Sequence, residues 1–237
     1  MQKKSIFIIV LAAIVACENS ENEPKSQQIK SSIKGIDFSN QKPESPDWEN
    51  VKEHYRFVIS RSVRAVDTNP NEGQHTWESR PDSNFIKNWK DLASNKITRG
   101  AYHLFSPQVS GAEQYQVFKK TVTLKKGDLP PILDAITNEC DLNQAEVWLD
   151  MAAKDCKCDP ILYVDENSIE KVSKKIAEYY LWLDTPNEKT FRKLKSNYSR
   201  IVFWQNKKDS NLSEFSEKVD FNEFIGEESD FQDLLIK

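Results

Sequence analysis

The chain has 237 residues, with 33 basic and 37 acidic side chains and a net charge of −4 at neutral pH. Nucleic-acid binding would favour a basic excess, which is absent. No cofactor is expected, because the chain has only 6 glycines and no glycine-rich phosphate loop. No metal site is expected either, because its 3 histidines (His54, His75 and His103) are scattered along the sequence, and His103 is expected to be structural.

The first residues have the pattern of a targeting segment. A basic start is followed by an apolar run from Ile6 to Ala16, which is too short to cross a bilayer as a mature helix. Small residues then precede Cys17, a pattern typical of a bacterial lipoprotein signal that is cleaved before the cysteine and lipidated on its thiol. An ordinary secretory signal with an incidental cysteine is the alternative. We predict a signal peptide at residues 1–16.

Residues 17–32 are predicted to form a disordered tether, because Glu18 to Ser26 contains no apolar residue. The protein is therefore expected outside the cytoplasm, anchored by lipid to a bacterial membrane. The acidic start of the tether resembles tethers that direct some lipoproteins to the surface of the outer membrane. The remaining residues, 33–237, are long enough for one large domain.

Three cysteines remain besides Cys17, an odd number for an exported protein. A disulfide from Cys140 to Cys156 or Cys158 is predicted, which leaves one thiol over. Cys156 and Cys158 are too close in sequence for a zinc-ribbon pair, and no histidine lies near them.

Strand and helix patterns alternate from Ile33 onward. In the first half we predict strands at Ile33–Phe38, Tyr55–Arg61 and Lys96–Phe105, a loop at Asp67–Pro81, and helices at Trp48–Glu53, at Phe85–Leu92 with Asp82 as its cap, and at Ala112–Val122. In the second half we predict strands at Pro131–Ala135, Pro160–Val164, Tyr179–Leu183, Arg200–Gln205 and Val219–Phe221, and helices at Leu142–Ala152 and Ile169–Ile176. The charged segment Asn187–Asn197 is left open as a helix or a long loop. This alternation predicts an α/β fold, an irregular (β/α) barrel of about eight strands, with a doubly wound sheet as the alternative.

Aspartates stand at several of the predicted strands. Asp37 closes the first strand, Asp134 closes the fourth, and Asp220 lies in the last. The carboxyl ends of barrel strands form the active-site face, so these carboxylates are candidate catalysts. A lone aspartate is more often a cap or turn residue, but three at matching strands favour a site. Two-residue alternation places Ile136 on the same side of its strand as Asp134.

Nine short motifs follow one another between Ile33 and the C-terminus: Gly35–Ser39, Asp47–Val51, Phe57–Ile59, Gly100–Phe105, Leu129–Asp134, Pro160–Tyr163, Leu181–Leu183, Trp204–Gln205 and Val219–Asn222. Their order resembles that in glycoside hydrolase family 25, the Chalaropsis-type lysozymes or N-acetylmuramidases. The resemblance implies an irregular barrel and cleavage of the bond after N-acetylmuramic acid in peptidoglycan.

The same resemblance assigns roles to individual residues. It implies that Asp37, Asp134 and Asp220 are catalytic, with Asp134 as the aspartate of the family's Asp-x-Glu pair. It also implies that the sugar lies against Tyr102, Trp182, Trp204 and Gln205. For these aromatic side chains, packing in the core is an equally good interpretation.

Two departures concern acidic positions of this family. Ile136 stands where the family has the glutamate that protonates the leaving oxygen, and Arg64 stands where a second motif, Lys-Ala-Thr-Glu-Gly, has its glutamate. Isoleucine cannot donate a proton, and the loss of general acid catalysis costs about 10²–10⁴ in rate. Glu139 is a candidate replacement acid, but it should lie beyond the strand end.

Three hypotheses of function follow. The first is a lysozyme-like peptidoglycan hydrolase with weak or no activity, the second a non-catalytic binder of glycan strands, and the third an immunity or decoy protein that interacts with a lysozyme-type toxin or another cell-wall-associated protein. The three aspartates that match the family favour the first two hypotheses, because a protein that binds only other proteins does not need carboxylates at the active-site end of the barrel. Ile136 and Arg64 favour the last two. We expect a lysozyme-like scaffold that turns over peptidoglycan poorly or not at all.

Overall fold

The structure is a computed structural model that describes residues 33–39, 46–70, 75–136 and 142–237. The signal peptide, the lipidated Cys17 and the tether lie outside the described residues, as do Glu139 and Cys140, so these predictions remain predictions. Within the described ranges, no helix is both long enough and apolar enough to cross a bilayer.

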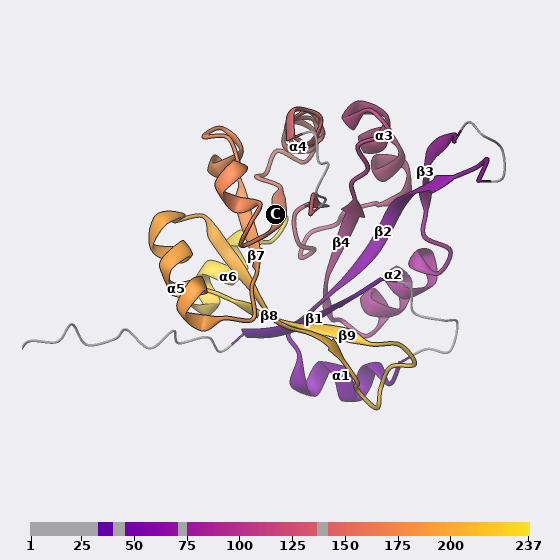
Figure 1. Ribbon diagram of the computed structural model, residues 1–237. Coiled ribbons are helices and arrows are strands. Elements are labelled where there is room, and N and C mark those ends of the chain that lie inside the picture. The colour runs from indigo at the N-terminus through magenta and orange to yellow at the C-terminus, as the bar shows by residue number, and fades with distance from the viewer. Residues whose placement is uncertain (1–32, 40–45, 71–74, 137–141) are drawn as a thin grey trace, which may run out of the picture.

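Eight strands form a closed barrel (Figure 1), as the sequence predicts. They are β1 (Ile33–Phe38), β2 (Phe57–Asp67), β4 (Thr98–Leu104), β5 (Ile132–Asp134), β6 (Ile161–Asp165), β7 (Tyr180–Asp184), β8 (Ile201–Ser210) and β9 (Val219–Phe224). The ring closes because β1 pairs with both β2 and β9. Neighbouring strands are parallel from β1 round to β8, whereas β9 runs antiparallel to both of its neighbours.

Helices surround this barrel: α1 (Trp48–His54), α2 (Phe85–Ser94), α3 (Gly111–Thr121), α4 (Leu142–Cys156), α5 (Glu188–Asn197) and α6 (Glu228–Leu234). Trp148 of α4 is fully buried against Phe118 and Tyr115 of α3, in the layer between helices and strands. The barrel interior is filled separately. Phe231 of α6 packs there, 5.8 Å from Phe57 and 5.1 Å from Phe224 between ring centroids. Because Phe57 begins β2 and Phe224 ends the antiparallel β9, α6 closes the amino-terminal end of the parallel strands.

Several local predictions were wrong. The predicted loop Asp67–Pro81 contains β3 (Trp77–Pro81), which among the described strands pairs with β2 alone and extends it as a two-stranded ribbon. Asp82 does not cap α2, whose N-cap residue is Asn84; the Asp82 carboxylate instead accepts a hydrogen bond from Arg61 Nε at 2.8 Å. The apolar stripe Ile169–Ile176 forms two separate 3₁₀ turns, Ile169–Lys171 and Ile176–Glu178, since a short stripe does not distinguish one helix from two buried turns. No error is involved at Asn187–Asn197, which was left open as a helix or a long loop and contains α5.

The disulfide prediction was also wrong. Cys156 and Cys158 are bonded to each other across a Cα–Cα distance of 5.3 Å, so neither is available to Cys140. The intervening Lys157 adopts a positive φ of 54°, which turns the chain tightly after α4 and brings the two sulfurs together.

Candidate active site

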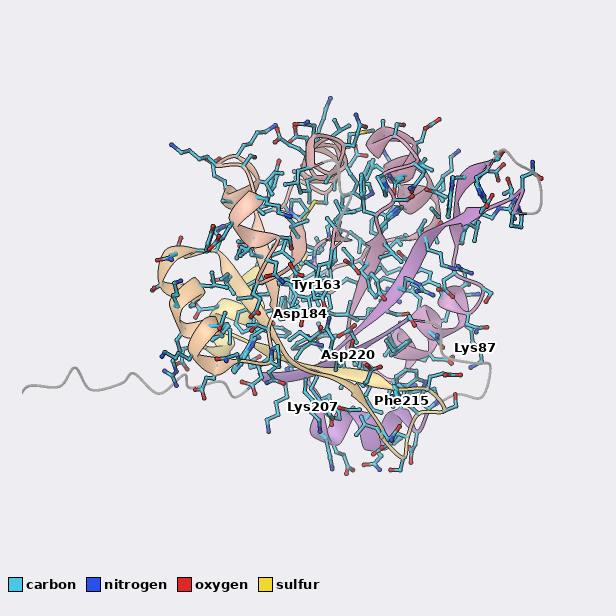
Figure 2. The ribbon with its side chains drawn as sticks, viewed as in Figure 1. Lys87, Tyr163, Asp184, Lys207, Phe215 and Asp220 are labelled. Carbon is cyan, nitrogen blue, oxygen red and sulfur yellow. A yellow bond between two sulfur atoms is a disulfide. The ribbon has the colours of Figure 1, made fainter. Side chains whose placement is uncertain are left out.

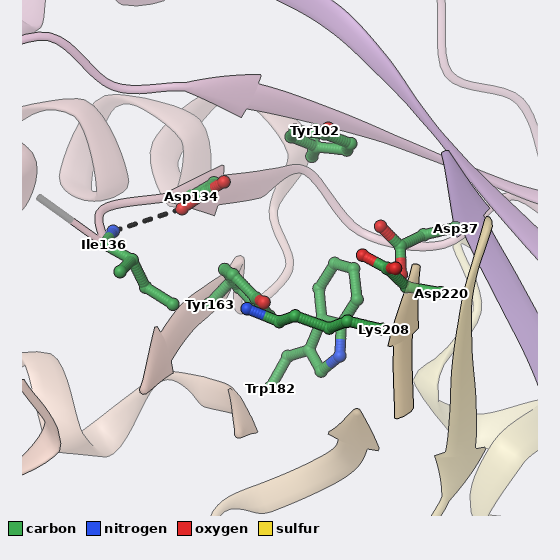
Figure 3. A pocket seen from close by; sticks show the side chains of 8 residues that line it. All are labelled: Asp37, Tyr102, Asp134, Ile136, Tyr163, Trp182, Lys208 and Asp220. Carbon is green, nitrogen blue, oxygen red and sulfur yellow. Dashed lines mark hydrogen bonds between the residues drawn. The ribbon is translucent and has the colours of Figure 1, made fainter. Parts of the chain in front are cut away.

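A pocket of about 250 Å³ lies at the carboxyl end of the parallel strands (Figure 3). This is the end of the barrel opposite α6. The lining residues of the pocket come from strands round the barrel, except Ile136, which follows β5: Asp37, Tyr102, Asp134, Ile136, Tyr163, Trp182, Lys208 and Asp220. The three predicted aspartates therefore meet in one cavity. Tyr163, Asp184 and Asp220 lie in the same central region of the whole molecule (Figure 2).

Asp37 of β1 and Asp220 of β9 lie opposite each other on neighbouring strands. They are directly paired in the register of β1 and β9. Asp37 lies near the end of its strand, as predicted, whereas Asp220 lies near the start of its strand. Asp220 nevertheless reaches the active-site end, because β9 is antiparallel and begins where the parallel strands finish.

Two relays of hydrogen bonds hold the carboxylate of Asp37. Gln205 Nε2 donates to Asp37 Oδ1 at 2.8 Å, and the Gln205 amide oxygen accepts from the Tyr163 hydroxyl at 2.5 Å. Asn222 Nδ2 donates to the same Oδ1 at 2.7 Å, and its oxygen accepts from the Trp182 indole at 2.8 Å. Each amide is thus fixed in orientation by an aromatic donor. Within the described residues Asp37 Oδ2 accepts no hydrogen bond, so it is available to a ligand.

Burial disfavours ionisation of Asp37 and Asp220. It raises the pKa of Asp37 well above its usual value, and the neighbouring Asp220 raises it further. Burial also raises the pKa of Asp220, while the backbone N–H of Asp209 and the ammonium of Lys208 lower it in part. Because two carboxylates this close repel each other when both are ionised, the pair is expected to titrate as a unit and to hold one proton more tightly than a lone aspartate would.

Asp134 lies on the other side of the pocket, at the end of β5 (Figure 3). Burial raises the pKa of this carboxyl to about 7, although the N–H of Ile136 donates to its Oδ1 at 3.1 Å and partly offsets the effect. Asp134 is therefore divided between its acidic and ionised forms near neutral pH. A group of this kind can exchange a proton with a ligand.

Ile136 lines the pocket on the same side as Asp134, as predicted, although it lies two residues beyond the end of β5. Its side chain packs against the apolar residues of the barrel interior and is only partly buried. Among the described residues, Asp37, Asp134 and Asp220 are the carboxylates that line the pocket. Glu139 lies outside the described residues.

Lys208 also lines the pocket, which its place in the sequence did not predict. Its ammonium forms an ion pair with Asp184 and lies 5.9 Å from the centroid of the Tyr163 ring. The strand was predicted to end at Gln205, but β8 continues to Ser210 with irregular pairing to β9 on both sides of Lys207. Such irregularities break the two-residue alternation, so the sequence could not show which side chains point inward. The roles of Asn222 and Tyr163 were not predicted either, although both residues belong to the family-like motifs Val219–Asn222 and Pro160–Tyr163.

The predicted sugar-binding surface is only partly present in the pocket. Tyr102 and Trp182 line the pocket, and Gln205 acts from behind it through Asp37. Trp204 does not line it, so its assignment to the sugar-binding surface was wrong. Trp204 faces outward, stacks on Phe191 of α5 with centroids 4.3 Å apart, and donates its indole N–H to the Thr185 carbonyl. Core packing was the correct alternative for this residue.

His103 is part of the buried core and lies outside the pocket. It is fully buried and hydrogen-bonds Gln114 at 2.9 Å through Nε2. Burial lowers its pKa to about 4, which keeps the ring neutral at physiological pH. In the part of the chain that the structure describes, no group of three or more histidine, cysteine or acidic side chains could hold a metal ion.

A closed (β/α) barrel with carboxylates converging at the carboxyl ends of its strands is an architecture typical of glycoside hydrolases. Residues 36–215 match the family model of glycosyl hydrolases family 25, so the chain belongs to that family.

Solved structures agree on the fold. The chain is similar to a muramidase from Acremonium alcalophilum (TM-score 0.68, 21% identity, covering 85% of this chain and 98% of that one). It is also similar to a lysozyme from Streptomyces coelicolor (TM-score 0.67, 19% identity, covering 86% and 97%). Among curated proteins, the uncharacterized protein YegX of Escherichia coli strain K12 is 29% identical over 207 residues, which are 84% of this chain and 72% of YegX.

Proposed function

We propose that this protein is a peptidoglycan-binding, lysozyme-like member of the family whose glycosidase activity is weak or absent. The observation that carries the proposal is Ile136, an aliphatic side chain that lines the pocket beside Asp134. Membership of the family and the muramidase-like fold support peptidoglycan as the ligand.

The preserved groups support binding. Asp37 is held by two oriented amides, and Tyr102 and Trp182 supply apolar ring surface in the same pocket. Carboxylates suit sugar hydroxyls as hydrogen-bond acceptors, and flat apolar faces of pyranose rings pack on aromatic side chains. A site that had lost all contact with glycans would not need this arrangement.

The altered groups argue against efficient turnover. Glycoside hydrolysis requires one group that protonates the leaving oxygen and a second that attacks the sugar carbon or activates water. Asp134 is the described carboxyl nearest in sequence to Ile136, and its pKa of about 7 would let it donate protons slowly in place of a dedicated acid. We therefore infer residual activity at most, through Asp134.

We further propose that the barrel is displayed outside the cytoplasm on a lipid anchor at Cys17. The apolar run, the small residues before Cys17 and the polar tether support this location. A lipid anchor would hold the site close to the cell wall, where peptidoglycan is found.

Hydrolysis and binding can be measured with the soluble domain, residues 33–237, and purified insoluble peptidoglycan. We expect few or no new reducing ends, together with co-sedimentation of the protein with the wall material. Asp134→Ala should weaken the co-sedimentation, because it removes a polar group from the pocket. Ready hydrolysis would overturn the proposed loss of activity, and absence of co-sedimentation would overturn the proposed binding and favour a protein partner.

A further inference from the structure

The β2–β3 ribbon presents two arginines directly opposite each other. Arg64 of β2 and Arg80 of β3 are partners in the antiparallel register, and both are exposed. Like charges at directly opposed positions destabilise a strand pair. This arginine pair does not stabilise the strand pairing. Binding of a negatively charged ligand would account for two arginines at these positions.

The arginine pair lies on the pocket side of the sheet. Arg64, Leu104 and Asp134 occupy one row across β2, β4 and β5. Leu104 packs against the barrel interior and Asp134 lines the pocket, so this row faces the barrel axis. The irregular pairing between Arg61 and Val63 brings Arg64 into that row. Two strand spacings separate Arg64 from Asp134, about 10 Å between backbones.

The two arginines differ in their partners. Arg80 Nη2 lies 3.0 Å from Glu78 Oε2 on the same strand. Arg64 has no hydrogen bond and no ion pair within the described ranges of the chain. Counting only described residues, the pair therefore carries one uncompensated positive charge, in contrast to the carboxylates at the centre of the pocket.

We propose that Arg64, supported by Arg80, binds a carboxylate of the stem peptide that peptidoglycan carries on its muramic acid. This inference rests on the proposed function and adds the peptide to the glycan as a recognised part of the ligand. A guanidinium matches a carboxylate with two parallel N–H donors, and a distance of about 10 Å from Asp134 is suited to a substituent of the glycan strand that the pocket holds. A glutamate at position 64, as in the family motif, would repel this group.

The test compares two preparations of the same insoluble peptidoglycan, one intact and one stripped of stem peptides with an N-acetylmuramoyl-L-alanine amidase. Binding of the soluble domain is measured by sedimentation over a range of wall concentrations. We expect the unmodified domain to bind the intact material roughly tenfold more tightly, and added salt to reduce the difference because both charges are exposed.

Arg64→Glu should abolish the preference for intact material while it leaves binding to the stripped glycan unchanged. Lys189→Glu is the matched control, since it makes the same change of charge at an exposed position of α5 outside the barrel and should keep the preference. Equal binding of both preparations by the unmodified domain would overturn this inference alone. Failure to bind either preparation would overturn the proposed function and this inference with it. Thermal melts of the unmodified domain and Lys189→Glu should coincide. Arg64→Glu should melt no lower, because a glutamate opposite Arg80 replaces a repulsive pair with an attractive one. A lost preference would then not reflect unfolding.

Discussion

An Ile136→Glu variant is expected to hydrolyse peptidoglycan about 10²–10⁴ times faster than the unmodified protein, the gain typical of a positioned general acid. The new carboxyl would enter a pocket that already contains Asp37, Asp134 and Asp220. Partial burial and these like-charged neighbours should raise its pKa, which keeps the proton available at neutral pH. Release of reducing ends from purified peptidoglycan measures the gain.

Two controls separate acid catalysis from a change of shape. Ile136→Gln has the same size as the glutamate variant but no acidic proton, and it should remain as slow as the unmodified protein. In the Ile136→Glu background, Asp37→Asn should remove most of the gained activity, because Asp37 is the carboxylate that the two amide relays orient. If Ile136→Glu binds peptidoglycan normally and gains no activity, a missing acid is not what limits this site.

The closed barrel and the convergence of three aspartates could be predicted from the sequence. Alternating strand and helix patterns indicate a barrel, and barrel closure brings the ends of distant strands together. This is why Asp37 of β1 and Asp134 of β5 share a pocket. Ile136 was also predicted to accompany Asp134 and does line the pocket, although it lies two residues beyond the end of β5 and strand alternation does not place it there.

Features that depend on strand direction and on irregular pairing could not be predicted. The sequence does not show that β9 is antiparallel, although that direction brings Asp220 to the pocket. Trp204 lies on a strand that is buried on both faces, so its apolar neighbours do not reveal which face it occupies. Lys208 follows an interruption of the β8–β9 pairing, and the Arg64 row depends on the shift after Arg61.

Asp134→Asn is expected to stabilise the protein at neutral pH by on the order of 2–4 kcal/mol, while it should change stability little near pH 4. Burial raises the folded-state pKa of Asp134 to about 7, whereas an unfolded chain has a value near its usual range. The folded protein therefore holds a proton that the unfolded chain releases between about pH 4 and pH 7. The stabilising effect of that proton is complete below this interval and is lost as pH rises through about 7. Asparagine never ionises, so the variant avoids the loss.

Urea denaturation of both proteins at several pH values would measure this difference, which should grow by at most about 1.4 kcal/mol per pH unit. Asp155→Asn is a control for which the opposite effect is expected. The ammonium of Lys119 and the hydroxyl of Tyr115 lower the pKa of Asp155. Replacement of Asp155 should therefore destabilise the protein at neutral pH and do so less in acid. A stability difference for Asp134→Asn that does not change with pH would mean that Asp134 titrates as an ordinary aspartate. A carboxylate that destabilises the fold at neutral pH needs a ligand to account for it, so a confirmed pH dependence would itself support a binding site centred on Asp134.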